Sequence, residues 1–91
     1  MKKETPLTLL QLKNIYGNDW DFFVERIIPN CLCYRCNKVV TIVGFKITVN
    51  DLNDVILEGK CAVCGDSVNR YCETGENEEY VKRIKKIIKG S

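Results

Sequence analysis

Two pairs of cysteines, each separated by two residues, constrain the fold of this chain more than any other feature. The first pair is Cys33 and Cys36, the second is Cys61 and Cys64, and 24 residues lie between the pairs. Each C-x-x-C segment can present two thiolates to one ion, and two such segments complete the four ligands of a tetrahedral site. The chain contains no histidine, so cysteine is the only soft ligand available. The spacing therefore predicts one zinc ion (Zn2+) per chain, held by these four cysteines.

The residue that follows each pair supports this choice of ligands. These residues are Asn37 and Gly65. In such a turn, or knuckle, the backbone after the second cysteine adopts a left-handed conformation, which Gly and Asn reach at low cost. The two remaining cysteines, Cys31 and Cys72, have no partner at this spacing, and we expect them to pack as small apolar side chains. One alternative stays open, in which Cys31 replaces Cys33 as a ligand.

Length and composition indicate a single domain of ordinary globular character. The chain has 91 residues, of which 45% are hydrophobic and 29% are charged. It has no long apolar run and no secretory leader pattern, so we expect no membrane association and a cytoplasmic location. The formal net charge is +2, but four thiolates and one zinc ion would bring it to about zero. Overall charge is thus no argument for nucleic-acid binding.

The first thirty residues show the periodicity of a short helical hairpin. Thr8 and Gln11 form a capping-box pattern, and Gly17 is suited to end the helix that follows. A second helix is expected to be capped by Asn18 or Asp19 and to end before Pro29. The residues expected on its buried stripe are Trp20, Phe23, Val24, Ile27 and Ile28.

The period changes to that of strands after the first cysteine pair. Strands are expected at 39–49, with a bulge at Gly44, and at 55–60 and 68–74, followed by a helix over 77–89 with Gly90 beyond it. The first of these strands should bury Phe45, Ile47 and Val49 and expose Lys46, Thr48 and Asn50.

The segments C-Y-R-C-N and G-K-C-A-V-C-G-D-S-V-N-R-Y resemble the short zinc-ribbon families found in many microbial proteins, over the range Cys33 to Thr74. The resemblance implies a small antiparallel sheet around the zinc, with only the four ligands and Gly65 carried over. We therefore expect an α+β fold in one domain, 1–91, made of a helical hairpin (1–30), a zinc ribbon (31–75) and a C-terminal amphipathic helix (76–91). Zinc ribbons occur in transcription factors, ribosomal proteins, topoisomerase tails and protein-interaction adaptors, so the resemblance implies no single function.

The last predicted helix favours a nucleic-acid-binding accessory or regulatory factor. Its apolar stripe, expected to face the core, consists of Tyr80, Val81, Ile84, Ile87 and Ile88. The basic residues expected on its outer face, as candidate contacts to DNA or RNA, are Lys82, Arg83, Lys85, Lys86 and Lys89. Further cations near the knuckles could extend this patch, namely Arg35, Lys38, Lys60 and Arg70. Lysines at a helix C-terminus also match the helix dipole, which explains the same residues without a ligand.

Two other functions remain open. A protein-interaction adaptor within a larger complex would use the stripe of the second helix, above all Trp20, Phe23 and Ile27, although these side chains also suit a core. A rubredoxin-like iron electron carrier would use the same four thiolates. We expect no enzyme and no small-molecule substrate, because the chain lacks histidine and a pocket-forming pair of carboxylates.

Overall fold

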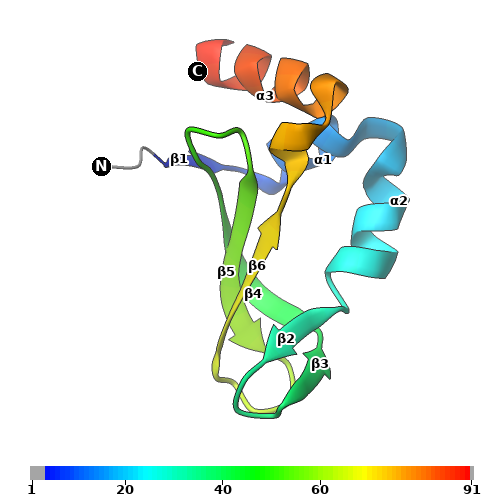
Figure 1. Ribbon diagram of the computed structural model, residues 1–91, viewed down its shortest axis with the longest axis vertical. Helices are drawn as coiled ribbons and strands as arrows, with labels where there is room; N and C mark the ends of the chain where they lie inside the picture. Colours follow the sequence, from blue (N-terminus) through cyan, green and yellow to red (C-terminus); the bar gives the residue numbers. More distant parts are fainter. Residues whose placement is uncertain (1–3, 91) are drawn as a thin grey trace.

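The computed structural model describes residues 4–90. Residues 1–3 and 91, which the expected ranges 1–30, 76–91 and 1–91 include, lie outside the described residues. The predicted α+β class is confirmed (Figure 1). In chain order the elements are β1 (Thr5–Leu7), α1 (Leu9–Tyr16), a 3-10 turn (Gly17–Asp19), α2 (Trp20–Phe22), a π-helical turn (Phe23–Ile27), β2 (Cys31–Cys33), β3 (Lys38–Val40), β4 (Ile42–Val49), β5 (Val55–Cys61), β6 (Ser67–Cys72), a second 3-10 turn (Thr74–Glu76) and α3 (Glu78–Gly90).

A four-stranded antiparallel sheet in the order β1-β4-β5-β6 forms the centre of the molecule. The β2–β3 hairpin forms a separate two-stranded sheet and contacts β6. Figure 1 shows this hairpin at one end of the molecule and α3 at the other end. The expected strand at 39–49 is therefore two strands, divided at Thr41 between the two sheets.

One face of the central sheet packs against the helices. Strand register aligns Ile47, Leu57 and Arg70 across β4, β5 and β6, and the first two of these side chains are buried. The helices contribute Leu12, Ile15, Phe23 and Ile84 to the same core, each with no exposed surface.

The capping box that opens α1 is present as predicted. The amide of Gln11 donates to Thr8 Oγ1 at 3.1 Å, and the amide of Thr8 donates to Gln11 Oε1 at 2.9 Å. The helix ends at Gly17, whose φ is +54°. Asp19 occupies the N-cap position of the second helix, as expected, but its side chain makes no capping bond. Its Oδ2 instead accepts a hydrogen bond from the Tyr80 hydroxyl at 2.7 Å.

The expected stripe of the second helix is wrong at Val24, which is exposed. The helix becomes a π-helix from Phe23, and the amide of Ile28 donates to the Phe23 carbonyl five residues earlier at 3.2 Å. The wider π turn changes which residues share a face. Phe23 and Ile27 remain buried, while Val24 turns outward.

The β4 strand follows the predicted alternation at Lys46, Ile47 and Val49, whereas Phe45 and Thr48 are both half-buried. The bulge is present, with a register shift between Val43 and Lys46 and a φ of +58° at Gly44. Asn50 was expected on the exposed face, but it is buried. Its Oδ1 accepts hydrogen bonds from the amides of Leu52 and Asp54, which fixes the loop between β4 and β5. Gly90 is the last residue of α3 rather than the residue beyond it.

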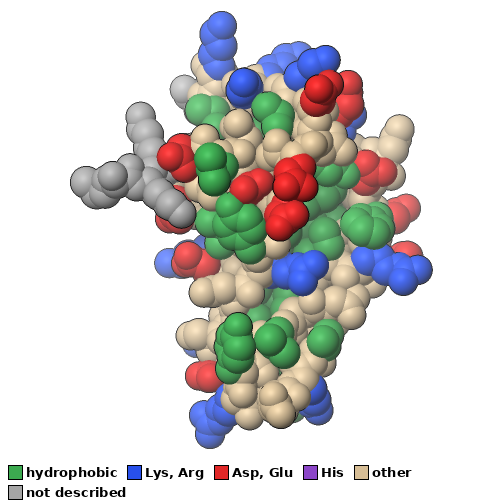
Figure 2. Space-filling view, in the orientation of Figure 1, with side chains coloured by type: hydrophobic (Ala, Val, Ile, Leu, Met, Phe, Trp, Pro, Cys, Tyr) green, Lys and Arg blue, Asp and Glu red, His purple; other side chains and the backbone are tan. Residues whose placement is uncertain are grey.

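Charged side chains gather at both ends of the molecule. Figure 2 shows basic side chains over α3 at the upper end and again around the β2–β3 hairpin at the lower end. The face between them carries acidic side chains in its upper part, further basic side chains at mid-height and apolar side chains throughout.

Candidate metal centre

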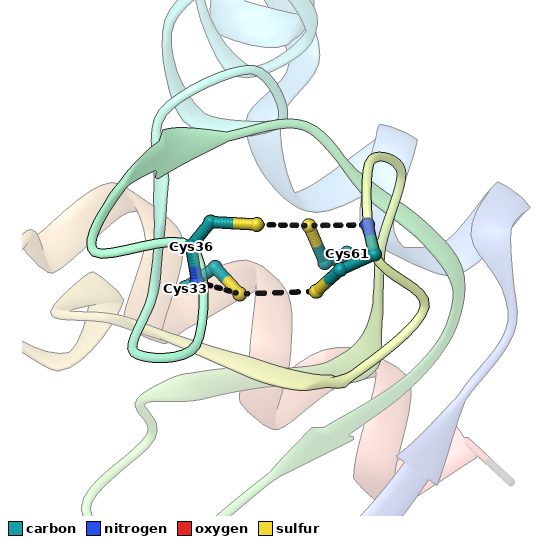
Figure 3. Close-up of side chains that lie close together, drawn as sticks. Cys33, Cys36 and Cys61 are labelled. Carbon is teal, nitrogen blue, oxygen red and sulfur yellow. Dashed lines mark hydrogen bonds between the residues drawn. The ribbon is translucent and has the colours of Figure 1, made fainter.

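The four cysteines predicted as ligands lie together at the lower end of the molecule. All four sulfurs lie within 4.8 Å of one another. The Sγ atoms of Cys33 and Cys64 are 3.6 Å apart, and those of Cys36 and Cys61 are 3.8 Å apart (Figure 3). Tetrahedral zinc with zinc–sulfur bonds of about 2.3 Å requires sulfur–sulfur distances of about 3.8 Å. The cluster is therefore positioned to bind one metal ion.

The first knuckle is built by the β2–β3 hairpin. Cys33 is the last residue of β2 and pairs with Lys38, the first residue of β3. The turn between them closes at Asn37, whose φ of +54° is the left-handed conformation expected there. The amide of Cys36 approaches the Cys33 sulfur at 3.4 Å as a hydrogen-bond donor. This turn brings both sulfurs to the same side of the hairpin.

The second knuckle connects β5 to β6 in the same way. Cys61 ends β5, and its sulfur accepts hydrogen bonds from the amides of Val63 at 3.3 Å and Cys64 at 3.4 Å. Gly65 has a φ of +77°, and its amide donates to the Cys61 carbonyl at 2.9 Å. The amide of Cys61 donates to the Asp66 carbonyl at 2.8 Å, which closes the turn.

The electrostatics of the cluster favour a bound cation. Burial alone would raise the pKa of Cys61, but the amide donors of Cys64 and Val63 outweigh it and lower this pKa to about 6. Hydrogen bonding to Cys64 and burial raise the pKa of Cys36 to about 12. One thiolate, that of Cys61, thus forms readily, and Cys36 resists ionisation beside it. A divalent cation among the sulfurs removes this repulsion.

Cys31 and Cys72 lie outside the cluster. Both are buried, and burial raises the pKa of each thiol. The Cys31 sulfur donates to the Ile27 carbonyl at 3.4 Å, so its side chain packs toward the helices. The sulfur cluster contains Cys33 and not Cys31. The alternative in which Cys31 replaces Cys33 as a ligand is therefore wrong.

The basic residues of α3 divide into two groups. Four are exposed, namely Lys82, Lys85, Lys86 and Lys89. Arg83 differs, because its side chain is half-buried and Nη1 donates to the Ile15 carbonyl at 2.8 Å. Within residues 4–90 the one ion pair joins Lys82 to Glu79 at 4.0 Å. The sequence placed Arg83 on the outer face of the helix, and the structure turns it toward α1.

The cations near the knuckles divide in the same manner. Arg35, Lys38 and Lys60 are exposed. Arg70 is half-buried on the inner face of β6, and its Nη1 donates to the Asn30 carbonyl at 3.3 Å. Arg70 therefore does not belong to an exposed basic patch.

Sequence reasoning did not identify the apolar side chains that surround the metal ligands. Leu32 and Val39 are cross-strand partners on the exposed face of the β2–β3 hairpin. Tyr34 and Val63 lie inside the two C-x-x-C turns and are also exposed. A sequence signal existed, because burial of Cys31 and Cys33 on one face of a strand places Leu32 on the other.

Comparisons with known proteins leave this site to be judged on its geometry. No protein-family model, no curated protein and no solved structure matches the chain. Among residues 4–90, no helix has the length and apolar character needed to cross a membrane. The chain carries a four-cysteine cluster with metal-binding geometry, and this cluster indicates a metal-binding structural protein.

Proposed function

We propose that the cluster binds one zinc ion per chain and that the ion has a structural role, as in a zinc ribbon. Four sulfur ligands leave no open coordination position for a substrate or a water, which is typical of structural zinc and not of catalytic zinc. The absorption spectrum of the purified protein tests the choice of metal. A zinc protein is colourless, whereas iron bound by four thiolates absorbs visible light and would establish the rubredoxin-like alternative.

We further propose that the protein is a cytoplasmic nucleic-acid-binding accessory factor that contacts phosphates through α3. The observation that carries this proposal is the exposure of four lysines within eight residues, while Ile84 of the same helix is fully buried. A rigid helix can hold such a set of ammonium groups toward a phosphate backbone.

The helix dipole is the competing explanation for these lysines. Acidic Glu78 and Glu79 at the first turn and basic Lys89 at the last turn match the dipole. The dipole acts mainly on the last turn, however, and Lys82 lies near the middle of the helix. The ion pair of Lys82 with Glu79 joins two side chains that are 73% and 67% exposed, so it contributes little to stability.

Fluorescence anisotropy with labelled single-stranded and double-stranded DNA and RNA tests the nucleic-acid role. We expect binding at about 50 mM salt that weakens steeply as salt rises, because bound lysines release counterions. Changing Lys82, Lys85, Lys86 and Lys89 together to Gln should weaken binding and reduce the salt slope by about 0.7 to 0.9 per lost phosphate contact. The absence of binding by the parent protein at low salt would exclude this role.

A matched control removes the same charge elsewhere. Its four changes, on exposed lysines outside α3, are Lys13→Gln, Lys38→Gln, Lys46→Gln and Lys60→Gln. If this control weakens binding and the α3 variant does not, the contact lies at the knuckles, around Arg35, Lys38 and Lys60.

A protein-interaction adaptor with no nucleic-acid role is the second candidate. The stripe first considered for this role is core, because Phe23 and Ile27 are buried and the Trp20 ring stacks on Phe23 with centroids 5.1 Å apart. The exposed apolar residues beside the metal favour the adaptor instead. Binding of a protein without any salt-dependent binding of DNA or RNA would distinguish it.

A further inference from the structure

An open pocket of about 510 Å³ lies between the end of α1, the second helix, β6 and the first turn of α3. The lining residues with groups suited to bind a ligand are Tyr16, Phe22, Arg26, Arg70, Glu73 and Tyr80. In Figure 1, β6 and α2 lie opposite each other in the right-hand part of the view, and Figure 2 shows basic side chains at mid-height in the same part. Pockets of about 300–1,000 Å³ are typical of sites for small molecules.

Two arginines line this pocket, and both are tied to Asn30. Nη1 of Arg70 donates to the Asn30 carbonyl at 3.3 Å, and Nδ2 of Asn30 donates to the Arg26 carbonyl at 2.6 Å. The Arg70 side chain is half-buried, and its Nε is buried without a hydrogen-bond partner among residues 4–90. Buried donors without a partner are rare in folded proteins. An anion bound beside this guanidinium would account for the unpaired donor.

The net charge of the pocket is positive. Arg26 and Arg70 contribute two positive charges and Glu73 one negative charge, and within residues 4–90 none of the three forms an ion pair. Burial raises the pKa of the Cys72 thiol and of the Tyr16 hydroxyl, so both groups stay neutral at pH 7. The pocket therefore favours an anionic ligand.

Aromatic rings form the remaining part of the pocket. The Phe22 side chain is 55% exposed, so one face of its ring is available to a ligand. The rings of Tyr16 and Tyr80 lie 5.1 Å apart, and Tyr16 is buried. Aromatic faces stack on planar rings, whereas guanidinium groups bind phosphate oxygens. The two kinds of side chain together suit a planar ligand that carries a phosphate.

We propose that this pocket binds a small phosphate monoester that carries an aromatic ring, the chemistry of a nucleoside monophosphate. Its phosphate contacts the guanidinium groups of Arg26 and Arg70, since a phosphate monoester has a charge of about −1.5 to −2 at pH 7. Its ring stacks on Phe22. The inference concerns binding and no reaction. It goes beyond the nucleic-acid role of α3 and does not depend on it.

The test is isothermal titration calorimetry of the zinc-loaded full chain with phenyl phosphate and with adenosine monophosphate. We expect saturable binding of one molecule per chain. Inorganic phosphate lacks the ring and benzoate lacks the second negative charge, so each should bind about tenfold more weakly or less. Tighter binding of adenosine monophosphate than of phenyl phosphate would identify a nucleotide as the ligand. Equal affinity of the two would support the wider class of aromatic phosphates.

Two variants remove the two kinds of contact separately. Arg26→Gln and Phe22→Ala should each raise the Kd of phenyl phosphate by about tenfold. Both side chains are exposed, and Arg26→Gln keeps the backbone carbonyl that binds Asn30, so the fold should be unchanged. The matched controls Arg35→Gln and Tyr34→Ala lie outside the pocket and are also exposed, and they should leave this Kd unchanged.

The change Arg70→Gln should weaken binding further. It also removes the hydrogen bond to the Asn30 carbonyl, so Arg26→Gln serves as the test if Arg70→Gln fails to fold. Zinc content and circular dichroism should match the parent for every other variant. The four-fold Gln variant of α3 should bind both esters with the affinity of the parent. The ligand result therefore stands even if the nucleic-acid role fails.

Several outcomes would overturn the proposal. One is the absence of saturable binding of either ester up to about 1 mM. Another is equal affinity for phenyl phosphate and benzoate. A third is an equal loss of affinity in the pocket variants and in their matched controls. If Arg26→Gln and Phe22→Ala weaken oligonucleotide binding and leave the affinity for both esters unchanged, the pocket belongs to a nucleic-acid interface instead.

Discussion

At the scale of single residues, the two knuckles reach the same geometry with different amino acids. The residue after the second cysteine has a φ of +54° at Asn37 and +77° at Gly65. Asn enters this region at a modest cost and Gly enters it at none. Both turns therefore leave the sulfurs free to accept amide hydrogen bonds, which lowers the charge that the thiolates present to one another.

Replacing a ligand should cost far more than replacing a buried cysteine that is not a ligand. We expect Cys61→Ser to abolish metal binding and the cooperative unfolding transition, because it removes a quarter of the coordination shell. Cys72→Ser should cost only about 1–2 kcal/mol of unfolding free energy, as a change within the core. Native mass spectrometry and denaturant unfolding measure the two effects. Full metal loss in Cys72→Ser, with Cys61→Ser tolerated, would mean that the ligand set is wrong.

The six cysteines should all resist alkylation in the metal-bound protein. Burial raises the pKa of Cys31 and Cys72, so at pH 8 both stay protonated, and only the thiolate reacts. The other four are held by the metal. Treatment with iodoacetamide at pH 8, followed by mass spectrometry, should show no labelled cysteine in the native protein and six in denaturant. Rapid labelling of Cys72 in the native protein would contradict its buried position.

At the scale of elements, the side chain of Arg83 in α3 binds the C-terminal end of α1. The Arg83 guanidinium donates to the Ile15 carbonyl, one of the last carbonyls of α1. Positive charge is favourable at a helix C-terminus. Gly17 leaves the space for it, since a Cβ there would lie 3.1 Å from Arg83 Nη1. The rings of Tyr16 and Tyr80, 5.1 Å apart, join the same two helices.

We therefore expect Arg83→Ala to lower the free energy of unfolding by about 1–3 kcal/mol, the cost of losing a hydrogen bond from a charged donor. Urea denaturation followed by circular dichroism measures the change. The matched control is Lys85→Ala, an exposed position on the same helix, which should alter stability by less than about 0.5 kcal/mol. Equal effects of the two changes would mean that the Arg83 contact contributes nothing specific.

The elements that the sequence predicted correctly are those specified by neighbouring residues. The capping box at Thr8, the stop at Gly17, the bulge at Gly44 and the two knuckles each depend on a few consecutive residues. The hydrogen bonds of the capping box and of the knuckle turns close within a few residues, and the glycine at position 44 marks its bulge directly, so the local pattern contains the necessary information.

The features that the sequence did not reveal depend on distant partners. The three-residue strand β1 exists only by pairing with residues 47–49 of β4. Arg83 turns inward because its guanidinium donates a hydrogen bond to a carbonyl 68 positions earlier in the chain. The Asp19 side chain accepts a hydrogen bond from the Tyr80 hydroxyl and does not cap its own helix. Asn50 is buried because it orders its own loop. No local periodicity records these contacts, since each requires the folded chain.

At the scale of the whole molecule, the metal and the core share the same strands. The molecule measures 38 × 32 × 21 Å along its principal axes. Strand β5 runs from Val55, which is fully buried in the core, to Cys61 at the metal. The strands therefore connect the metal end to the helices directly. Loss of order at one end should spread to the other.

Removal of the metal should consequently unfold the entire chain in one transition. A structural zinc ion supplies on the order of 10 kcal/mol, and small domains have only about 5–15 kcal/mol of stability in total. Trp20, the one tryptophan, stacks on Phe23 in the helical region and can report on this remote part of the core. A chelator should change its fluorescence together with the far-ultraviolet circular dichroism, and added zinc should restore both. Chelator already saturated with zinc is the control. If the Trp20 signal stays native while amides of the knuckles lose protection from hydrogen exchange, the helices and sheet fold without the ion, and the metal orders only the end that carries the two knuckles.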